Sequence, residues 1–296
     1  MRYRIYFIAI VLILTCFLSL NCGKKTLAQK NITVSILPQK YFVERIAGDK
    51  YAINLLIPPG HSPATYELTA MQIKALQNSI IYFTIGHISF EKTYIEKIKS
   101  VNKKMKIIDT SKGVALIKGN HDYHNNSKTK NNTINGIDPH IWLSPTAVKI
   151  IALNIYKSIS EIDPDNKLFY KNNYLNFIKD IEDLDKKIRE SLKDIKNREF
   201  MIYHPSFEYF ARDYELKQIA IETDGKSPSL ASIKNFLDIA REKNIKVIFV
   251  QSQSPTHEAE AIARDIDAKV MLIDPLALDW LTNIESITET FRRSMK

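Results

Sequence analysis

Short runs of β-branched and other apolar residues alternate with amphipathic stretches along most of the chain, and the alternation occurs in two series. This order is typical of βαβ units, which build a parallel sheet with helices on both faces. The first series predicts strands at 33–37, 51–57, 80–85 and 106–108 and helices at 40–47, 69–78 and 90–101. The second predicts strands at 199–203, 217–221, 246–250 and 269–273 and helices at 206–214, 229–243, 256–267 and 281–294. We therefore expect two α/β lobes, each with a mostly parallel sheet flanked by helices.

A largely helical stretch separates the two series. Ser144-Pro145 is expected to begin one helix, and Asp163-Pro164 a second, because proline suits the first turn of a helix. From Pro164 to about Lys196 apolar residues recur at three- and four-residue spacing without another proline or glycine, which predicts one long rigid helix of roughly 50 Å at 1.5 Å per residue. The predicted organisation is an N-terminal lobe at 30–145, connecting helices at 146–197 and a C-terminal lobe at 198–296.

The amino terminus, residues 1–28, is expected to be an export signal. Arginines precede an apolar run of 16 residues at 5–20, shorter than the roughly 20 residues that a membrane-spanning helix needs. Cys22 follows directly and is the candidate for lipid attachment and the mature amino terminus, although the residues before it fit the lipoprotein pattern poorly. Cleavage after Ala28 is the alternative. The second cysteine, Cys16, lies within the signal, so disulfides and thiolate metal sites are excluded.

The charge of the chain does not indicate a nucleic-acid partner. The formal net charge is +9, but the lysines are scattered among acidic residues, as in 179–198, and no basic run with interleaved aromatic residues occurs. Residues 119–136 contain many Asn, Lys, Ser and Thr residues and are expected to form a mobile surface loop. We expect a monomer that binds no nucleic acid.

Three histidines and one aspartate lie at turns, each with a proline within two residues: His61, His140, His204 and Asp274. Successive members are 79, 64 and 70 residues apart, so they can converge only through the fold. Three neutral imidazoles and a carboxylate are a coordination set for a borderline divalent ion such as Zn²⁺, which takes nitrogen and oxygen ligands at about 2.0–2.2 Å. The sequence therefore predicts that the chain carries such an ion.

Six segments occur in the order of a known family: GHSPATYELT, DPHIWLSP, YHPSFEYFARDY, IETDGKSPS, FVQSQSP and LIDPLALDW. With them the chain, over about residues 32–296, resembles the zinc/manganese-type (ZnuA/TroA-like) substrate-binding proteins of bacterial metal ABC transporters. The resemblance implies a bilobed α/β receptor whose lobes are bridged by a rigid helix. It also implies that the metal sits in the cleft between the lobes and is delivered to an ABC permease. The export signal with Cys22 adds the expectation of a location in the periplasm or at the cell surface, with membrane anchoring through a lipid.

Carried over residue by residue, the resemblance places His61 and His140 as metal ligands in the first lobe, and His204 and Asp274 in the second. Manganese-selective relatives often have a glutamate where this chain has His204, so the resemblance favours Zn²⁺, with a manganese-selective receptor of the same class as the alternative. Many members have an acidic residue where Gln251 stands, and no metal role is assigned to Gln251.

Other polar residues near the motifs are secondary candidates. Glu67 could hold an imidazole in place or act as an alternative ligand, and His121 and His124 are candidates for weak metal contacts from their loop. His87 and His257 are expected to be ordinary surface or hydrogen-bonded histidines. Glu222 is expected to stabilise its loop, and Asp138 and Trp142 to shape the turn around His140.

Three other functions remain open from the residues alone. A zinc hydrolase would leave one coordination position for water and use Glu67 or Glu208 as its base, but Asp274 would fill that position and no His-Glu-x-x-His helix occurs. An iron-chelate receptor has no need of three inward-pointing histidines. A surface adhesin would also suit a lipid anchor, but no residue pattern specifies its ligand. We therefore expect a transport receptor that catalyses no reaction.

Overall fold

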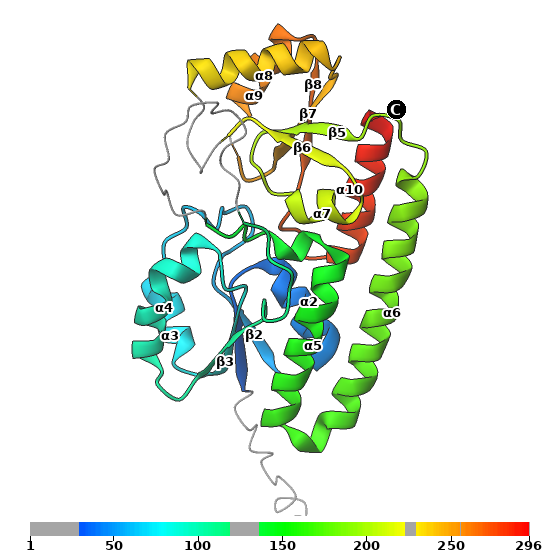
Figure 1. Cartoon of the computed structure of the whole chain (residues 1–296). Helices are drawn as coiled ribbons and strands as arrows, with labels where there is room; N and C mark the ends of the chain where they lie inside the picture. The colour runs from blue at the N-terminus through cyan, green and yellow to red at the C-terminus, as the bar shows by residue number, and fades with distance from the viewer. Residues whose placement is uncertain (1–29, 119–135, 223–228, 255, 296) are drawn as a thin grey trace, which may run out of the picture.

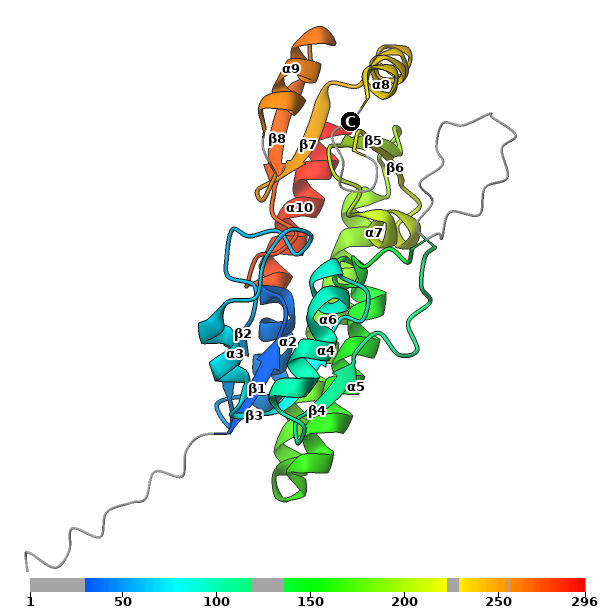
Figure 2. The ribbon, with the colours of Figure 1, turned by 90° about the vertical axis from the view of Figure 1, so that its left-hand side faces the viewer.

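The structure, a computed structural model, describes residues 30–118, 136–222, 229–254 and 256–295. Two four-stranded parallel sheets lie one above the other in Figure 2, which confirms the predicted bilobed α/β class. Across this described part of the chain, no helix combines the length and apolar character needed to cross a bilayer. The predicted signal with Cys22, and the predicted loop with His121 and His124, lie outside the described residues.

The N-terminal lobe has the strand order β2-β1-β3-β4, with every neighbouring pair parallel. Its strands are β1 (Asn31–Val34), β2 (Ala52–Leu55), β3 (Ser79–Thr84) and β4 (Lys106–Asp109). Its helices are α2 (Leu37–Ala47), α3 (Ala70–Leu76) and α4 (Ser89–Val101). Because crossover connections are right-handed, the change of direction after β2 places α2 on one face of the sheet and α3 with α4 on the other.

The C-terminal lobe repeats this arrangement, with the strand order β6-β5-β7-β8 and only parallel pairs. Its strands are β5 (Glu199–Ile202), β6 (Lys217–Ala220), β7 (Val247–Gln251) and β8 (Lys269–Ile273). Its helices are α7 (Glu208–Asp213), α8 (Leu230–Glu242), α9 (His257–Asp265) and α10 (Trp280–Ser294). By the same handedness rule α7 lies on one face, and α8 and α9 pack together on the other.

Two long helices connect the lobes: α5 (Pro145–Ile162) and α6 (Lys167–Leu192). The hydroxyl of Ser144 accepts a hydrogen bond from Ala147 N at 3.0 Å, which caps α5 at the predicted position. Helix α6 packs against α2 and α5 of the N-terminal half and against α10 of the C-terminal lobe (Figure 1). It therefore runs along both lobes as the predicted bridge.

Helix α6 is shorter than predicted at both ends. Pro164–Asn166 forms a separate 3₁₀ turn, so the helix has 26 residues, or roughly 39 Å at 1.5 Å per residue. At the other end the Arg198 guanidinium donates to the carbonyl oxygens of Leu192 and Lys193 at 3.1 and 3.4 Å. Because these bonds satisfy carbonyls that a continuing helix would use, α6 ends at Leu192.

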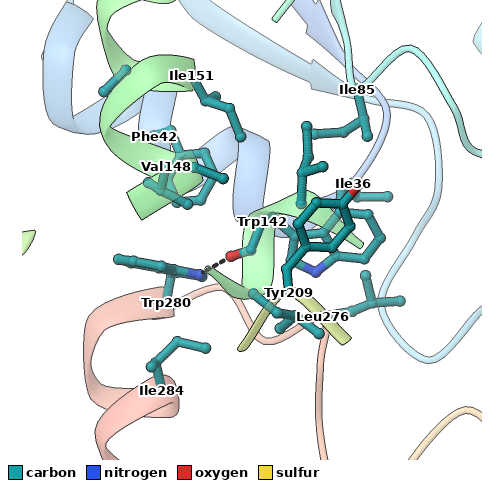
Figure 3. Close-up of a cluster of buried hydrophobic side chains, with 14 of the residues drawn as sticks. Ile36, Phe42, Ile85, Trp142, Val148, Ile151, Tyr209, Leu276, Trp280 and Ile284 are labelled. Atoms are coloured by element: carbon teal, nitrogen blue, oxygen red, sulfur yellow. Dashed lines mark hydrogen bonds between the residues drawn. The ribbon is translucent and has the colours of Figure 1, made fainter. Parts of the chain in front are cut away.

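A single hydrophobic cluster crosses the boundary between the lobes, and Figure 3 shows its centre around two tryptophans. Trp142, in the short 3₁₀ helix η1 (Ile141–Leu143), donates from Nε1 to Pro275 O at 2.8 Å. Trp280, the first residue of α10, donates from Nε1 to Trp142 O at 2.6 Å and packs edge-on against Phe42 of α2 at 5.3 Å between ring centroids. Each lobe therefore satisfies buried polar groups of the other within the same apolar core.

A second cluster lies entirely within the C-terminal lobe, on the face covered by α8 and α9. Its buried members include Met201, Phe236, Ile248 and Ile262. The sheet of this lobe thus separates two hydrophobic clusters, of which one is shared with the N-terminal lobe and the other is not.

A buried carboxyl group fixes the turn that follows β3. Glu91 of α4 accepts hydrogen bonds from Ile85 N at 2.9 Å and Gly86 N at 2.7 Å, and from the Ser35 hydroxyl. Burial raises the pKa of Glu91 from its usual 4.5 to about 7, and these three hydrogen bonds act in the opposite direction. The turn is therefore held by a carboxyl group whose ionisation is unfavourable because it is buried.

We expect Glu91 to make folding less favourable as the pH rises. A carboxyl whose pKa is higher in the folded state than in the unfolded state contributes fully below pH 4.5, and that contribution is lost as the pH passes about 7. The loss is on the order of 3 kcal/mol. Glu91→Gln has no group that titrates at this position, so its stability should not show this loss. The unfolding free energy of wild type minus that of the variant should therefore fall by about 3 kcal/mol between pH 4.5 and pH values above 7.

Urea unfolding at several pH values measures this difference. The exposed Glu96 of the same helix, replaced by Gln, is the matched control and should leave the pH dependence unchanged. Parallel pH profiles of wild type and Glu91→Gln would contradict the assignment.

Candidate metal site

Three of the four predicted ligands lie in loops that follow a strand, and the fourth lies in the turn before η1. His61 is in the loop after β2, His140 directly precedes η1, His204 follows β5, and Asp274 directly follows β8. Parallel strands bring the loops at their carboxyl ends to the same edge of a sheet, where α/β proteins bind ligands. The fold therefore brings residues that are distant in sequence toward the junction of the lobes.

His140 of the first lobe and His204 of the second face each other. Their ring centroids are 5.3 Å apart with an interplanar angle of 76°. The two side chains are 13% and 29% exposed, so both remain partly accessible to a small ion. This is the pair of predicted ligands that the structure brings into direct proximity.

A carboxylate from its own turn holds the His140 ring. Asp138 Oδ1 lies 2.9 Å from His140 N and 2.8 Å from His140 Nδ1. The carbonyl of Asp138 accepts a hydrogen bond from the hydroxyl of Tyr209 at 2.9 Å, and that hydroxyl also accepts one from Ile117 N at 3.0 Å. Tyr209 belongs to α7, so the C-terminal lobe helps to fix the turn that carries His140.

A second carboxylate holds His204 in the same way. Glu222 follows β6, and its Oε2 lies 3.1 Å from His204 Nδ1 while its side chain is only 11% exposed. At the end of β7, the buried Gln251 accepts a hydrogen bond from His204 N at 3.3 Å and donates one to His204 O at 2.6 Å. The neighbouring strands β6 and β7 therefore fix the ring and the backbone of His204.

These contacts determine which ring nitrogens are free. An ionised carboxylate only accepts hydrogen bonds, so the proton of each neutral imidazole must be on Nδ1, facing Asp138 or Glu222. The Nε2 lone pairs of His140 and His204 are then available. A carboxylate behind each imidazole is the usual support of a metal-binding histidine.

Asp274 is fixed by hydrogen bonds from its own loop and from Gln253. Its Oδ1 accepts hydrogen bonds from Gln253 Nε2 at 2.7 Å and from Leu276 N at 2.8 Å. The next residue, Pro275, accepts the indole hydrogen bond of Trp142, two residues after His140. The aspartate therefore lies in a segment attached directly to the turn of His140.

His61 and Glu67 are placed differently from the other candidates. Both side chains are exposed in the loop between β2 and α3, and the His61 ring lies against Tyr66 at 5.0 Å between ring centroids. Within the described residues, the Glu67 carboxylate makes no hydrogen bond or ion pair. The structure thus gives Glu67 no partner among the imidazoles of this part of the chain.

Among residues 30–118, 136–222, 229–254 and 256–295, no three His, Cys, Asp or Glu side chains are close enough together to hold a metal ion. The complete set of His61, His140, His204 and Asp274 therefore stays a prediction. The other two described histidines are outside the pair: His257 is 76% exposed, and His87 Nε2 lies 3.4 Å from the Ser111 hydroxyl.

Sequence reasoning missed the supporting contacts of Glu222 and Gln253. Glu222 was expected only to stabilise its loop, and Gln253 was not singled out. Both follow strands of the C-terminal sheet, as His204 and Asp274 do. The signal that could have identified them is this shared position after neighbouring predicted strands.

Two α/β lobes bridged by a long helix, with a supported imidazole from each lobe at their junction, define a bilobed binding protein for a small ligand. A family model confirms this class independently of the geometry. The model described as "Zinc-uptake complex component A periplasmic" (ZnuA) matches residues 32–294, and the chain belongs to this family.

Relatives and solved structures agree with this assignment. The chain is 30% identical over 255 residues to the high-affinity zinc uptake system protein ZnuA of Bacillus subtilis (strain 168), covering 83% of this chain and 78% of that protein. It is 28% identical over 270 residues to the zinc-binding lipoprotein AdcA of Streptococcus pneumoniae (strain ATCC BAA-255 / R6), covering 88% of this chain but only 51% of AdcA. A crystal structure of ZnuA superposes with a TM-score of 0.83 at 39% identity, covering 90% of this chain and 99% of that one.

The family determines the class of function. The chain is an extracytoplasmic metal-binding receptor of an ABC uptake system, as predicted, and it is not an enzyme. The hydrolase alternative is therefore wrong.

Proposed function

We propose that this chain binds Zn²⁺ at the junction of its lobes through His61, His140, His204 and Asp274, and delivers it to an ABC permease. A donor set of three imidazole nitrogens and one carboxylate oxygen suits Zn²⁺. The zinc-related descriptions of the family and of the two relatives support the same ion. Mn²⁺ is the alternative cargo, since the same donors bind several first-row metals.

The observation that carries the proposal is the supported pair of imidazoles from opposite lobes. Metal affinity depends on donors that are already oriented and on partners that fix the protonated nitrogen. Asp138 and Glu222 supply this support from 2.8 and 3.1 Å. Two nitrogen donors are therefore oriented before the ion arrives.

The remaining two ligands complete the site in different ways. Asp274 contributes one carboxylate oxygen from a loop that is tied to the turn of His140 by Trp142. His61 has to leave its contact with Tyr66 and approach the ion, and its exposed position in the loop after β2 leaves room for that movement. Capture of the ion thus orders the loop of His61 against the prepared pair.

The location of the receptor follows partly from the family and partly from this proposal. We infer that Cys22 carries a lipid that keeps the receptor, as a monomer, at the outer face of the cytoplasmic membrane near its permease. The description of the pneumococcal relative as a lipoprotein supports the anchor. Mass spectrometry of the membrane-extracted protein identifies the acyl group at Cys22 or, alternatively, an amino terminus after Ala28.

Zinc titration of the metal-stripped protein tests the site. We expect one Zn²⁺ per chain in wild type, and an affinity about 10-fold lower in Glu222→Gln, because a neutral amide oxygen accepts the Nδ1 proton of His204 more weakly than a carboxylate and lowers the basicity of the ring. Glu96→Gln, on the exposed face of α4, is the control and should bind like wild type. A wild-type protein that binds no divalent ion would refute the proposed function.

A further inference from the structure

The carboxylate of Asp274 has two oxygens with unequal surroundings. Oδ1 accepts one hydrogen bond from Gln253 Nε2 at 2.7 Å and another from Leu276 N at 2.8 Å. A carboxylate offers about four lone-pair sites on its two oxygens, so these bonds fill those of Oδ1. Oδ2 is therefore the oxygen that remains for a metal.

The loop around Asp274 is fixed, so the two carboxylate oxygens do not easily exchange places. Asn283 Nδ2 of α10 donates to Asp274 O at 2.7 Å, and Ser252 N donates to Ile273 O at 2.9 Å. These bonds hold the backbone on both sides of the carboxylate. Rotation of the side chain to present Oδ1 would break two hydrogen bonds without moving the loop.

Gln253 holds Asp274 at a cost to its own hydrogen bonding. Among the described residues, its buried Oε1 has no hydrogen-bond partner, a condition shared there by two other buried side-chain atoms, Ser160 Oγ and Asn235 Nδ2. An unpaired buried acceptor destabilises a protein by about 1–3 kcal/mol. Stability alone therefore does not explain an amide at this position, whereas its contact with Asp274 does.

We propose that Gln253 sets the metal preference of the site by restricting Asp274 to coordination through one oxygen. This inference rests on the proposed function, in which Asp274 is a ligand. Zn²⁺ is satisfied by four donors in a tetrahedron, whereas Mn²⁺ prefers six and favours oxygen. Blocking Oδ1 withholds an additional oxygen that Mn²⁺ would use and Zn²⁺ does not need.

Substitution of Gln253 by methionine removes the N–H donor and keeps a side chain of similar length. With only the Leu276 N–H left on Oδ1, the carboxylate can bind through both oxygens. We expect the ratio of the Mn²⁺ to the Zn²⁺ dissociation constant to fall about tenfold, mainly through tighter Mn²⁺ binding, which is within the range of effects of supporting residues. Gln253→Ala carries the same expectation and is used if the methionine variant does not fold.

Competition titrations with Zn²⁺ and Mn²⁺ measure the ratio, and the visible spectrum of bound Co²⁺ reports the coordination number. The Co²⁺ absorption of the variant should weaken, as expected when a four-coordinate ion gains a ligand. His257→Ala, four residues after Gln253 and 76% exposed, is the control and should match wild type. An unchanged ratio and spectrum, or an equal loss of affinity for both ions, would overturn the inference while leaving zinc binding by the wild type intact. Failure of the wild type to bind Zn²⁺ would instead overturn the proposed function.

Discussion

Replacing His140 by alanine should lower the affinity for Zn²⁺ by about 100-fold or more. Binding free energies of four-ligand zinc sites are about 10–16 kcal/mol, so one ligand accounts for roughly 3 kcal/mol. A tenfold change in affinity corresponds to about 1.4 kcal/mol. His204→Ala should have a similar effect, because the two rings lie 5.3 Å apart and would bind the same ion.

Isothermal titration with a competing chelator gives the affinities of wild type and variants. His257→Ala removes a histidine that is 76% exposed and should bind like wild type. The double variant His140→Ala/His204→Ala should lose less than the sum of the single losses, because the second substitution acts on a site that is already incomplete. Affinities of the single variants within a few fold of wild type would show that the pair is not the metal site.

The second large effect concerns the junction of the lobes. Trp280→Ala should lower the free energy of unfolding by about 3–5 kcal/mol, the usual cost of removing a buried tryptophan side chain. Trp280 is 1% exposed, packs against Phe42, and donates its indole N–H to Trp142 O. Trp280→Phe keeps much of the apolar contact but leaves that carbonyl unpaired, so a smaller loss of about 1–3 kcal/mol is expected.

Urea unfolding followed by circular dichroism measures both values. Leu278→Ala, two residues earlier and 40% exposed, is the control and should change stability by less than about 0.5 kcal/mol. If Trp280→Ala were no more harmful than Leu278→Ala, the tryptophan pair would not hold the lobes together. If Trp280→Phe behaved like wild type, the hydrogen bond to Trp142 would contribute nothing.

Most strands and helices could be predicted from the sequence because each has a clear apolar pattern between turn residues. The strand predicted at 269–273 coincides with β8, and the helix predicted at 281–294 differs from α10 by one residue. The long helix was overextended because no proline or glycine marks its end. Its actual end depends on Arg198, whose bonds to Leu192 and Lys193 are made only in the folded chain.

The ligand set stays a prediction, and of the side chains that support it the sequence indicated Asp138 but not Glu222 or Gln253. His140 and His204 come together because the turn before η1 and the loop after β5 meet at the junction of the lobes. The contact of Glu222 with His204 depends on the pairing of β5 with β6, which places residues 18 positions apart side by side. No spacing rule for helices or turns connects two such residues, so only the sheet order reveals the pair.

The boundary that divides the molecule by shape is not the boundary that divides its hydrophobic interior. One cluster fills the first lobe and continues to the near face of the second sheet, while the other is confined beyond that sheet under α8 and α9. Separating the chain between residues 197 and 198 would therefore expose apolar surface on both fragments. Local unfolding of α8 and α9 would therefore disturb the rest of the molecule least.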